Sequence, residues 1–209
     1  VILQIKNLDK IDVLINNAGA LFLKREVNSK GIEKTFAVNY LSHFYLTISL
    51  IDVIKKTKNS RLVNISSMVH KFAKLNLNDM NFSKNYNGYV AYFNSKLMNL
   101  LFSYKINRIY HNYINCYAIH PGWLNTNFGS NNQSNIRFLL NFVKGKFAKK
   151  PSYVADEIYN ICTAQEYLNY SGKYFVKNNI TKSSDLSYRE DLQDELWEKS
   201  FKMINIQKK

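Results

Sequence analysis

The chain has 209 residues, of which 46% are hydrophobic, and a formal net charge of +14. This length suits one domain with a substantial core and is short for two. The positive charge comes from 24 Lys dispersed along the chain and only 5 Arg. Because Arg is the usual base-reading residue, we expect no nucleic-acid partner and favour a basic surface that suits a phosphate-bearing cofactor.

The first half of the chain predicts two strands and one long helix. An apolar strand over 11–18 ends in the turn-prone Asn16-Asn17-Ala18-Gly19. A helix is expected over 32–55, followed by a second strand over 61–66. A polar, Asn-rich connection then leads to about Gly88.

The second half continues the alternation of helices and strands. A helix over 89–111 has one apolar stripe through Phe93, Leu97, Leu100 and Tyr104. A strand over 114–119 is followed by a polar and basic excursion over 124–150, and Pro151 suits the first turn of a helix over 152–167. A strand over 172–176 and a helix over 192–204 complete the chain. This order predicts a single α/β domain, residues 1–209, built on a parallel sheet, with 124–150 as a substrate loop or lid.

The cysteines and the hydropathy of the chain indicate in which cellular compartment we expect the protein. Cys116 and Cys162 have neither metal-ligand spacing nor the number for a disulfide framework, so a reducing compartment, by default the cytoplasm, is expected, and no metal site. The most apolar helical stretch, 40–54, is too short and too polar to span a bilayer. The basic residues of 144–150 beside the apolar 138–140 are compatible with peripheral membrane contact, but a loop and short helix over a pocket is favoured.

The pair Tyr92 and Lys96 carries the most chemical information. Four residues apart on the helix over 89–111, the phenol and the ammonium lie one turn apart on one face. A neighbouring cation favours the phenolate and lowers the tyrosine pKa from its usual value near ~10, which suits proton transfer near neutral pH. Roughly two such pairs are expected by chance in a chain this rich in Tyr and Lys, so the weight of the pair depends on its context.

That context is a set of short motifs in a fixed order. The motifs are Asn16-Asn17-Ala18-Gly19 after a strand, Asn39, Ser66-Ser67 after a strand, Tyr92 with Lys96, and His120-Pro121-Gly122. Together they resemble the short-chain dehydrogenase/reductase family, in particular its retinol-dehydrogenase-like branch, over nearly the whole chain. The resemblance implies a Rossmann-like, doubly wound parallel sheet and an NAD(P)-dependent oxidoreductase that interconverts a carbonyl and an alcohol.

The resemblance also implies a role for each catalytic residue. Tyr92 is the general acid in carbonyl reduction and the base in alcohol oxidation. Lys96 lowers the tyrosine pKa and binds the nicotinamide ribose. Ser67, rather than Ser66, donates a hydrogen bond to the substrate oxygen. Asn39 holds a water of the proton relay behind Lys96.

The cofactor and substrate follow from the same resemblance. NADP is favoured over NAD, with Asn16, Ala18 and Gly19 at its adenosine half. Its nicotinamide end is contacted by Tyr92 and Lys96 together with Pro121, Gly122, Leu124 and Thr126. Apolar aldehydes, retinoids or steroids are the expected substrates, Trp123 narrows the pocket, and a homodimer is compatible with the family.

Each motif taken alone has a simpler interpretation. Asn16-Asn17-Ala18-Gly19 suits an ordinary strand-exit turn, and Ser66-Ser67 suits a helix cap. His43 and His70 are best interpreted as structural or surface residues, and Cys116 as a small buried hydrophobe. It is the ordered set that favours the enzyme.

One expected part of the family is missing from the sequence. The family holds the cofactor pyrophosphate with a Gly-rich turn after its first strand. This chain has seven Gly, and the nearest two, Gly122 and Gly129, are seven residues apart. Compared with the family, we therefore expect the 209 residues to lack that phosphate loop and roughly the first three strands with their helices. We expect the strand over 11–18 to expose an edge and an apolar face, and a longer parent protein to supply the rest.

Two alternative functions remain open at this stage. The first is an inactive fragment or non-catalytic remnant that keeps the site residues but does not bind the cofactor alone, which the missing phosphate loop favours. The second is a sugar-nucleotide epimerase or dehydratase of the extended branch of the family, which also uses a Tyr and a Lys four residues apart. Asn16-Asn17-Ala18-Gly19 and the small C-terminal portion argue against that branch.

Overall fold

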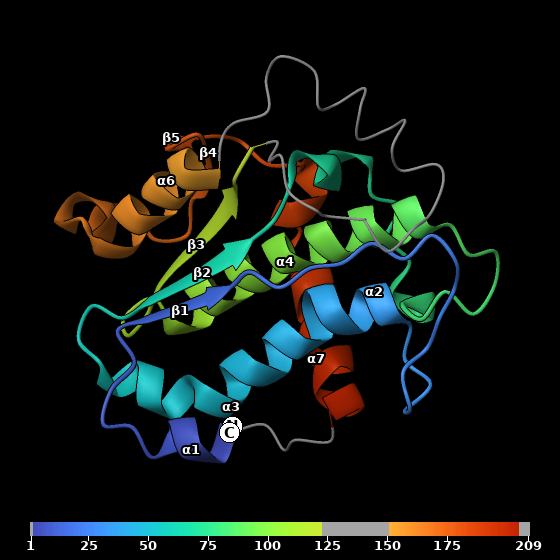
Figure 1. The fold of residues 1–209 in the computed structure, drawn as a ribbon, viewed down its shortest axis with the longest axis horizontal. Helices are drawn as coiled ribbons and strands as arrows, with labels where there is room; N and C mark the ends of the chain where they lie inside the picture. Colours follow the sequence, from blue (N-terminus) through green and yellow to red (C-terminus); the bar gives the residue numbers. More distant parts are fainter. Residues whose placement is uncertain (1, 123–150, 205–209) are drawn as a thin grey trace.

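The computed structural model describes residues 2–122 and 151–204 and contains a five-stranded sheet (Figure 1). The strands lie in the order β1 (Val13–Asn16), β2 (Arg61–Ile65), β3 (Asn115–His120), β4 (Tyr174–Val176) and β5 (Asn179–Ile180). The first four are parallel, which confirms the predicted α/β architecture, and β5 pairs antiparallel with β4.

Helices precede, connect and follow the strands of the sheet. They are α1 (Ile2–Lys6), α2 (Lys34–Phe36), the π-helix η1 (Ala37–Leu41), α3 (Ser42–Lys56), α4 (Gly88–Tyr110), α6 (Pro151–Thr163) and α7 (Glu190–Ile204). Short 3-10 helices lie between them: η2 (Met68–Phe72), η3 (Leu77–Asp79), η4 (Gln165–Tyr170) and η5 (Asp185–Tyr188). The helix expected over 152–167 ends at Thr163 and continues as η4 after one residue.

Helices cover the sheet on two sides, as the doubly wound prediction requires (Figure 1). On β2, Leu62 packs into the core formed with α3, α4 and α7. Its neighbours Val63 and Ile65 point to the other face and pack against α6. Because both faces of β2 are covered, every residue of this strand is buried.

Helix α4 is more deeply buried than its single apolar stripe predicted. Leu97 and Leu101 join the core that contains α3 and α7, whereas Leu100 and Tyr104 join a second cluster with β3 and β4. The one-stripe expectation was wrong because α7 and η5 also pack against this helix. Polar residues of its first half, Lys96 among them, therefore lie inside the protein.

The helix expected over 32–55 is present over Lys34–Lys56, so the helical segment extends beyond the apolar stretch 40–54. The structure joins α2, η1 and α3 into 23 continuous residues, which by length and composition alone meet the criteria for a membrane span. The expectation that this region is too short was therefore wrong. Phe36, Tyr40 and Phe44 of this segment are nevertheless buried in the core, as in the central helix of a globular domain.

Strand β1 forms one edge of the described sheet. Its one strand neighbour among residues 2–122 and 151–204 is β2. Ile15 is on the same face as Val63, but the residue is 42% exposed because α6 covers the middle of the sheet. The exposed edge and apolar face expected for 11–18 are thus present. The proposed lid over 124–150 lies outside the described residues.

Candidate active site

The motif residues gather at the carboxyl ends of the parallel strands. Asn16 ends β1, Ser66 and Ser67 follow β2, and His120 ends β3. Parallel strands bring these ends to one edge of the sheet, where open α/β sheets bind their ligands. The first turns of α4 bring Tyr92 and Lys96 to the same edge, because Lys96 bonds the last residue of β2.

Lys96 is the electrostatic centre of this site. Its Nζ lies 5.4 Å from the centroid of the Tyr92 ring and donates a hydrogen bond of 3.1 Å to the carbonyl oxygen of Ile65. Only 4% of the residue is exposed. Burial away from water disfavours the ammonium and lowers the Lys96 pKa to about 8.

The pKa of Tyr92 does not follow the sequence-based expectation. A lowered value was predicted from the adjacent cation, whereas burial raises the Tyr92 pKa above its ordinary value. The ammonium faces the ring of Tyr92, and its own desolvation disfavours the charge that would stabilise a phenolate. For the Tyr92 pKa, the effect of burial therefore outweighs the attraction between the two side chains.

Asn39 ties the loop after β1 to helix α4. Its Oδ1 accepts a hydrogen bond from the Ala20 amide at 2.7 Å, and its Nδ2 donates to the Ala20 carbonyl and to the Ser95 hydroxyl at 2.9 and 3.0 Å. Asn39 belongs to the π-helix η1, a local distortion that is frequent at functional sites. A Cβ at Gly19 would lie 3.5 Å from Lys96 Nζ, so the loop passes directly beside the ammonium.

The two serines have different surroundings. The Ser66 hydroxyl donates to the Lys96 carbonyl at 2.8 Å and so fastens β2 to α4. The Ser67 oxygen only accepts a long 3.5 Å bond from the Val69 amide at the start of η2. Of the two, Ser67 therefore has the hydroxyl that is available to donate to a ligand.

Asn16 is more deeply buried than the other residues of its motif. Its Nδ2 donates to Thr47 Oγ1 at 3.0 Å and to Asn64 Oδ1 at 2.7 Å, and the residue is 1% exposed. This side chain holds β1, β2 and α3 together, so its amide donor is engaged inside the fold. Ala18 and Gly19 of the same motif are on the surface, where a ligand can reach their backbone.

The turn after β3 also lies at the site, beside the loops that follow β1 and β2. His120 is buried, and burial, with smaller contributions from His70, Lys177 and Lys96, lowers its pKa to about 4. Pro121 and Gly122 are partly exposed, and Gly122 has a φ of +83° with open space where a Cβ would stand. Leu124 and Thr126, expected to contact the nicotinamide, and Trp123, expected to narrow the pocket, lie outside the described residues.

Sequence reasoning missed two histidines near this site. His43 and His70 are both buried, so the possibility that they are surface residues is wrong. Burial and then the charge of Lys96 lower the His43 pKa to about 4. His43 follows Asn39 by four residues on one helical segment, a spacing that could have placed it near the site. His70 follows Ser67 by three residues, which could have placed it beside Ser67, but its contact with Ser184 has no comparable sequence signal.

The described residues fit one half of a nicotinamide cofactor. A buried ammonium beside an open glycine backbone suits a hydroxyl-bearing ring such as ribose. The pyrophosphate requires closely spaced glycines, which the 209 residues do not contain. Among the residues that the structure describes, no group of three His, Cys, Asp or Glu could hold a metal ion.

Comparisons with known proteins agree on one family. A family model described as short chain dehydrogenase matches residues 2–137. The chain is 31% identical to mouse (Mus musculus) retinol dehydrogenase 13 over 97% of its own length and 62% of that protein. It is 30% identical to human (Homo sapiens) polyprenol dehydrogenase over 94% and 62%. The chain therefore spans about three fifths of the curated relatives that it matches.

Solved structures share the fold at low sequence identity. The NADPH-bound carbonyl reductase from chicken fatty liver has a TM-score of 0.61 and 17% identity, over 87% of this chain and 69% of that one. A protein from Mycobacterium Paratuberculosis reaches a TM-score of 0.70 and 24% identity, over 99% and 71%. At these identities the likeness shows the fold alone.

Proposed function

The chain belongs to the short-chain dehydrogenase family, in its retinol-dehydrogenase-like branch, and on that premise we propose that it contains the proton-transfer half of an NAD(P)-dependent oxidoreductase. The reaction interconverts a carbonyl and an alcohol. The supporting observation is the buried Lys96 ammonium beside the Tyr92 ring at the carboxyl edge of the sheet. Burying a cation destabilises a fold, and buried ionisable groups with shifted pKa values are typical of functional sites.

Tyr92 acts as the general acid when the carbonyl is reduced. Its raised pKa means that the phenol holds its proton at neutral pH and can release it to an oxygen that becomes negative. Lys96, with a pKa of about 8, is still largely charged at pH 7 and stabilises the phenolate that forms. In alcohol oxidation the phenolate is the base, so the raised pKa of Tyr92 means that oxidation requires a higher pH than reduction.

Ser67 and Asn39 complete the set. The Ser67 hydroxyl donates to the substrate oxygen and stabilises its developing charge, while Ser66 only fastens α4 to β2. Asn39 holds the backbone of Ala20, and through it the loop that carries Gly19, beside Lys96. It can thereby keep a water of the proton relay in place.

A nicotinamide cofactor, when bound, supplies the hydride. Lys96 and Tyr92 would hold its ribose, Pro121 and Gly122 would contact its nicotinamide end, and the exposed backbone of Ala18 and Gly19 would line its adenosine half. We favour NADP over NAD by branch resemblance, and the name of the NADPH-bound carbonyl reductase is consistent with that choice. Since the 209 residues contain no closely spaced glycines, the phosphates are held weakly by this chain.

The proposed substrate is an apolar aldehyde or alcohol. Support comes from the names of the relatives, which include retinol dehydrogenases and a polyprenol dehydrogenase. A homodimer, peripheral membrane contact and a cytoplasmic location stay predictions. The second candidate function is a non-catalytic remnant, which the lack of a Gly-rich turn favours.

Cofactor binding distinguishes the two candidates. Fluorescence titrations with NADPH and with reduced nicotinamide mononucleotide should both show binding, with affinities within about tenfold, because only the nicotinamide half is firmly held. Lys96→Met should abolish both signals, whereas the exposed Lys30→Met should leave them unchanged. A remnant would bind neither compound, and a much tighter complex with NADPH would show that the chain does hold the phosphates.

A further inference from the structure

His70 bridges two segments that lie 114 residues apart in the chain. Its Nδ1 is 2.6 Å from the carbonyl oxygen of Ser67, and its Nε2 accepts a hydrogen bond of 3.0 Å from the amide of Ser184. A carbonyl can only accept and an amide N–H can only donate. The two partners therefore fix one neutral form of the ring, with its proton on Nδ1.

The surroundings of the ring favour this neutral form. His70 is 1% exposed, and its ring meets the ring of Tyr174 edge-on, with the centroids 5.4 Å apart. Burial is the largest cause that lowers the His70 pKa, and the charge of Lys71 acts in the same direction. His120 also faces it from the end of β3.

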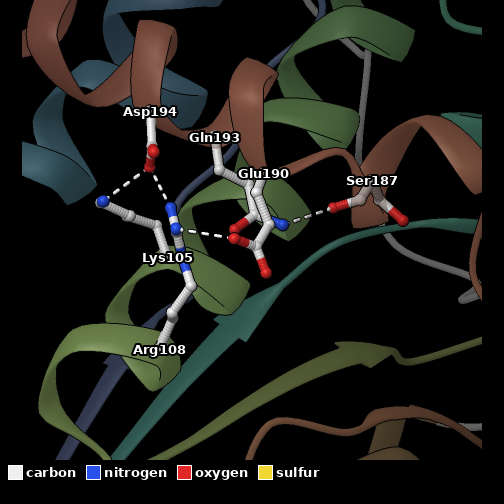
Figure 2. Close-up of polar contacts among 6 residues, drawn as sticks. All are labelled: Lys105, Arg108, Ser187, Glu190, Gln193 and Asp194. Atoms are coloured by element: carbon white, nitrogen blue, oxygen red, sulfur yellow. Dashed lines mark hydrogen bonds and ion pairs between the residues drawn. The ribbon is translucent and has the colours of Figure 1, made fainter.

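The segment at the far end of the bridge is firmly held. The Ser187 hydroxyl donates to the Ser184 carbonyl at 2.5 Å, and Ser183 shares a 2.7 Å hydrogen bond with the Tyr104 hydroxyl of α4. Gln193 of α7 donates to the Ser187 carbonyl at 3.1 Å, as Figure 2 shows.

Ion pairs fix α7 itself. Asp194 accepts from Lys105 at 2.6 Å and from Arg108, both on α4, and Glu190 accepts from Arg108 at 2.9 Å (Figure 2). The Ser184 amide is thus anchored to the core of the protein through α4 and α7. The His70 ring, which accepts a hydrogen bond from this amide, is therefore held in a fixed position.

The near end of the bridge is the backbone of Ser67. The Ser67 carbonyl accepts from both the ring and the backbone amide of His70, the latter at 3.1 Å. Among the residues that the structure describes, the Ser67 side chain has only the long contact with the Val69 amide. The orientation of the Ser67 hydroxyl therefore depends on how well its backbone is held.

We propose that His70 is a positioning residue. Its hydrogen bonds to the Ser184 amide and the Ser67 carbonyl hold the backbone of Ser67 in place relative to residues 183–188. The effect on catalysis rests on the proposed function, in which Ser67 donates to the substrate oxygen. The bridge itself does not depend on it. Protonation of His70 in acid replaces its acceptor at Nε2 with a second N–H, which faces the Ser184 amide and opens the bridge.

Three variants distinguish the hydrogen bond at Nδ1, to Ser67, from the hydrogen bond at Nε2, to Ser184. His70→Asn keeps a donor where Nδ1 lies, His70→Gln keeps an acceptor where Nε2 lies, and His70→Phe keeps only the ring against Tyr174. The exposed His111→Asn is the matched control. Nitrogen NMR of the wild-type protein should show the proton of His70 on Nδ1.

Amide hydrogen exchange tests the bridge without any activity. His70→Phe should speed exchange at least tenfold at both Ser184 and Val69, whose amide contacts the Ser67 oxygen. His70→Gln should keep Ser184 protected, and His111→Asn should change neither amide. Faster exchange at Ser184 with no change at Val69 would overturn the proposal.

Turnover then tests the catalytic consequence. Each His70 variant should lower kcat for carbonyl reduction at least tenfold, with the KM for NADPH within twofold of wild type. In the wild-type protein, kcat should fall at acidic pH as His70 is protonated, and this fall should be absent in His70→Phe. A wild-type kcat in His70→Asn, which lacks the Ser184 link, would contradict the proposal. If the wild-type protein reduces no carbonyl, the proposed function fails, while the exchange data still decide on the bridge.

Discussion

At the scale of single residues, burial dominates the chemistry of the site. Four residues of spacing place Tyr92 and Lys96 together, but their pKa values move in the directions that desolvation dictates. The Lys96 ammonium has one backbone carbonyl within hydrogen-bond distance, that of Ile65. A cofactor ribose, if bound there, would give this cation the oxygen partners that a folded protein alone provides poorly.

Replacing Lys96 should therefore stabilise the protein in a pH-dependent way. Below pH 8 the folded chain carries a desolvated charge, which costs up to about 3 kcal/mol for a pKa near 8 instead of 10.5. Lys96→Met should raise the free energy of unfolding at pH 7 by up to this amount. The Ile65 carbonyl keeps Asn99 as its donor, so the substitution leaves it hydrogen-bonded.

The sign of the pH dependence is fixed by linkage. Between pH 8 and about 10 the unfolded wild-type chain keeps a proton on Lys96 that the folded chain has released, so wild-type stability rises with pH relative to the variant. Urea unfolding at pH 7, 8 and 9.5 should show the gap between the two proteins narrowing. A constant gap would mean that Lys96 is not desolvated in the folded state.

At the scale of elements, a buried arginine determines where α6 ends. The guanidinium of Arg61, on β2, donates to the carbonyls of Ile161 at 2.5 Å, Ala164 at 2.8 Å and Thr163 at 3.4 Å. The residue is only 4% exposed. It supplies donors to carbonyls that a helix end leaves without partners, and its charge suits the negative end of the helix dipole.

Removing these donors should destabilise the fold. Arg61→Met leaves buried carbonyls without donors and should lower the free energy of unfolding by about 2–4 kcal/mol. The control is Arg189→Met, which removes an exposed pair with Asp191 and should change stability by less than about 1 kcal/mol. Chemical denaturation measures both, and equal effects of the two substitutions would rule out the capping role of Arg61.

Sequence patterns predicted the long elements and missed the short ones. Apolar runs placed β1 to β4 and helix α4 within about two residues of their observed ends. Strand β5 has two residues and α1 has five, too few to form a periodic pattern. The end of α6 was predicted too late because its cap, Arg61, lies about 100 residues earlier in the chain.

For the candidate site, the sequence could predict proximity only between residues of one segment. Residues that one segment carries in fixed spacing, such as Tyr92 and Lys96, could be paired from the sequence. The contacts of Asn16, turned inward to Asn64, and of His70, bonded to Ser184, depend on segments distant in the chain. No local pattern records such contacts.

At the scale of the whole molecule, the sheet is covered unevenly. Helices bury both faces of β2, but β1 lies at an edge of the described sheet with Ile15 42% exposed. An edge strand with an exposed apolar side chain offers backbone and side chain to another copy of the chain. We therefore expect the isolated 209-residue chain to self-associate through β1.

A charge on this strand should reduce that association. Ile15→Lys places a cation on the edge, a common means of preventing edge-to-edge pairing. The control Ile109→Lys changes a similarly exposed isoleucine, 38% exposed, on the surface of α4 where no strand edge is available. Sedimentation velocity across a concentration series should show less association for Ile15→Lys only, and equal behaviour of the two variants would exclude β1 as the contact.

The central claim is that Tyr92 passes a proton in a reaction whose hydride comes from a nicotinamide. The most direct measurement is a single-turnover reduction of an apolar aldehyde with NADPH deuterated at the transferred position, followed by mass analysis of the alcohol. The wild-type chain should transfer the deuterium at least about 100-fold faster than Tyr92→Phe, the contribution expected of a general acid. Equal rates for the two proteins, or no labelled alcohol from either, would contradict the account.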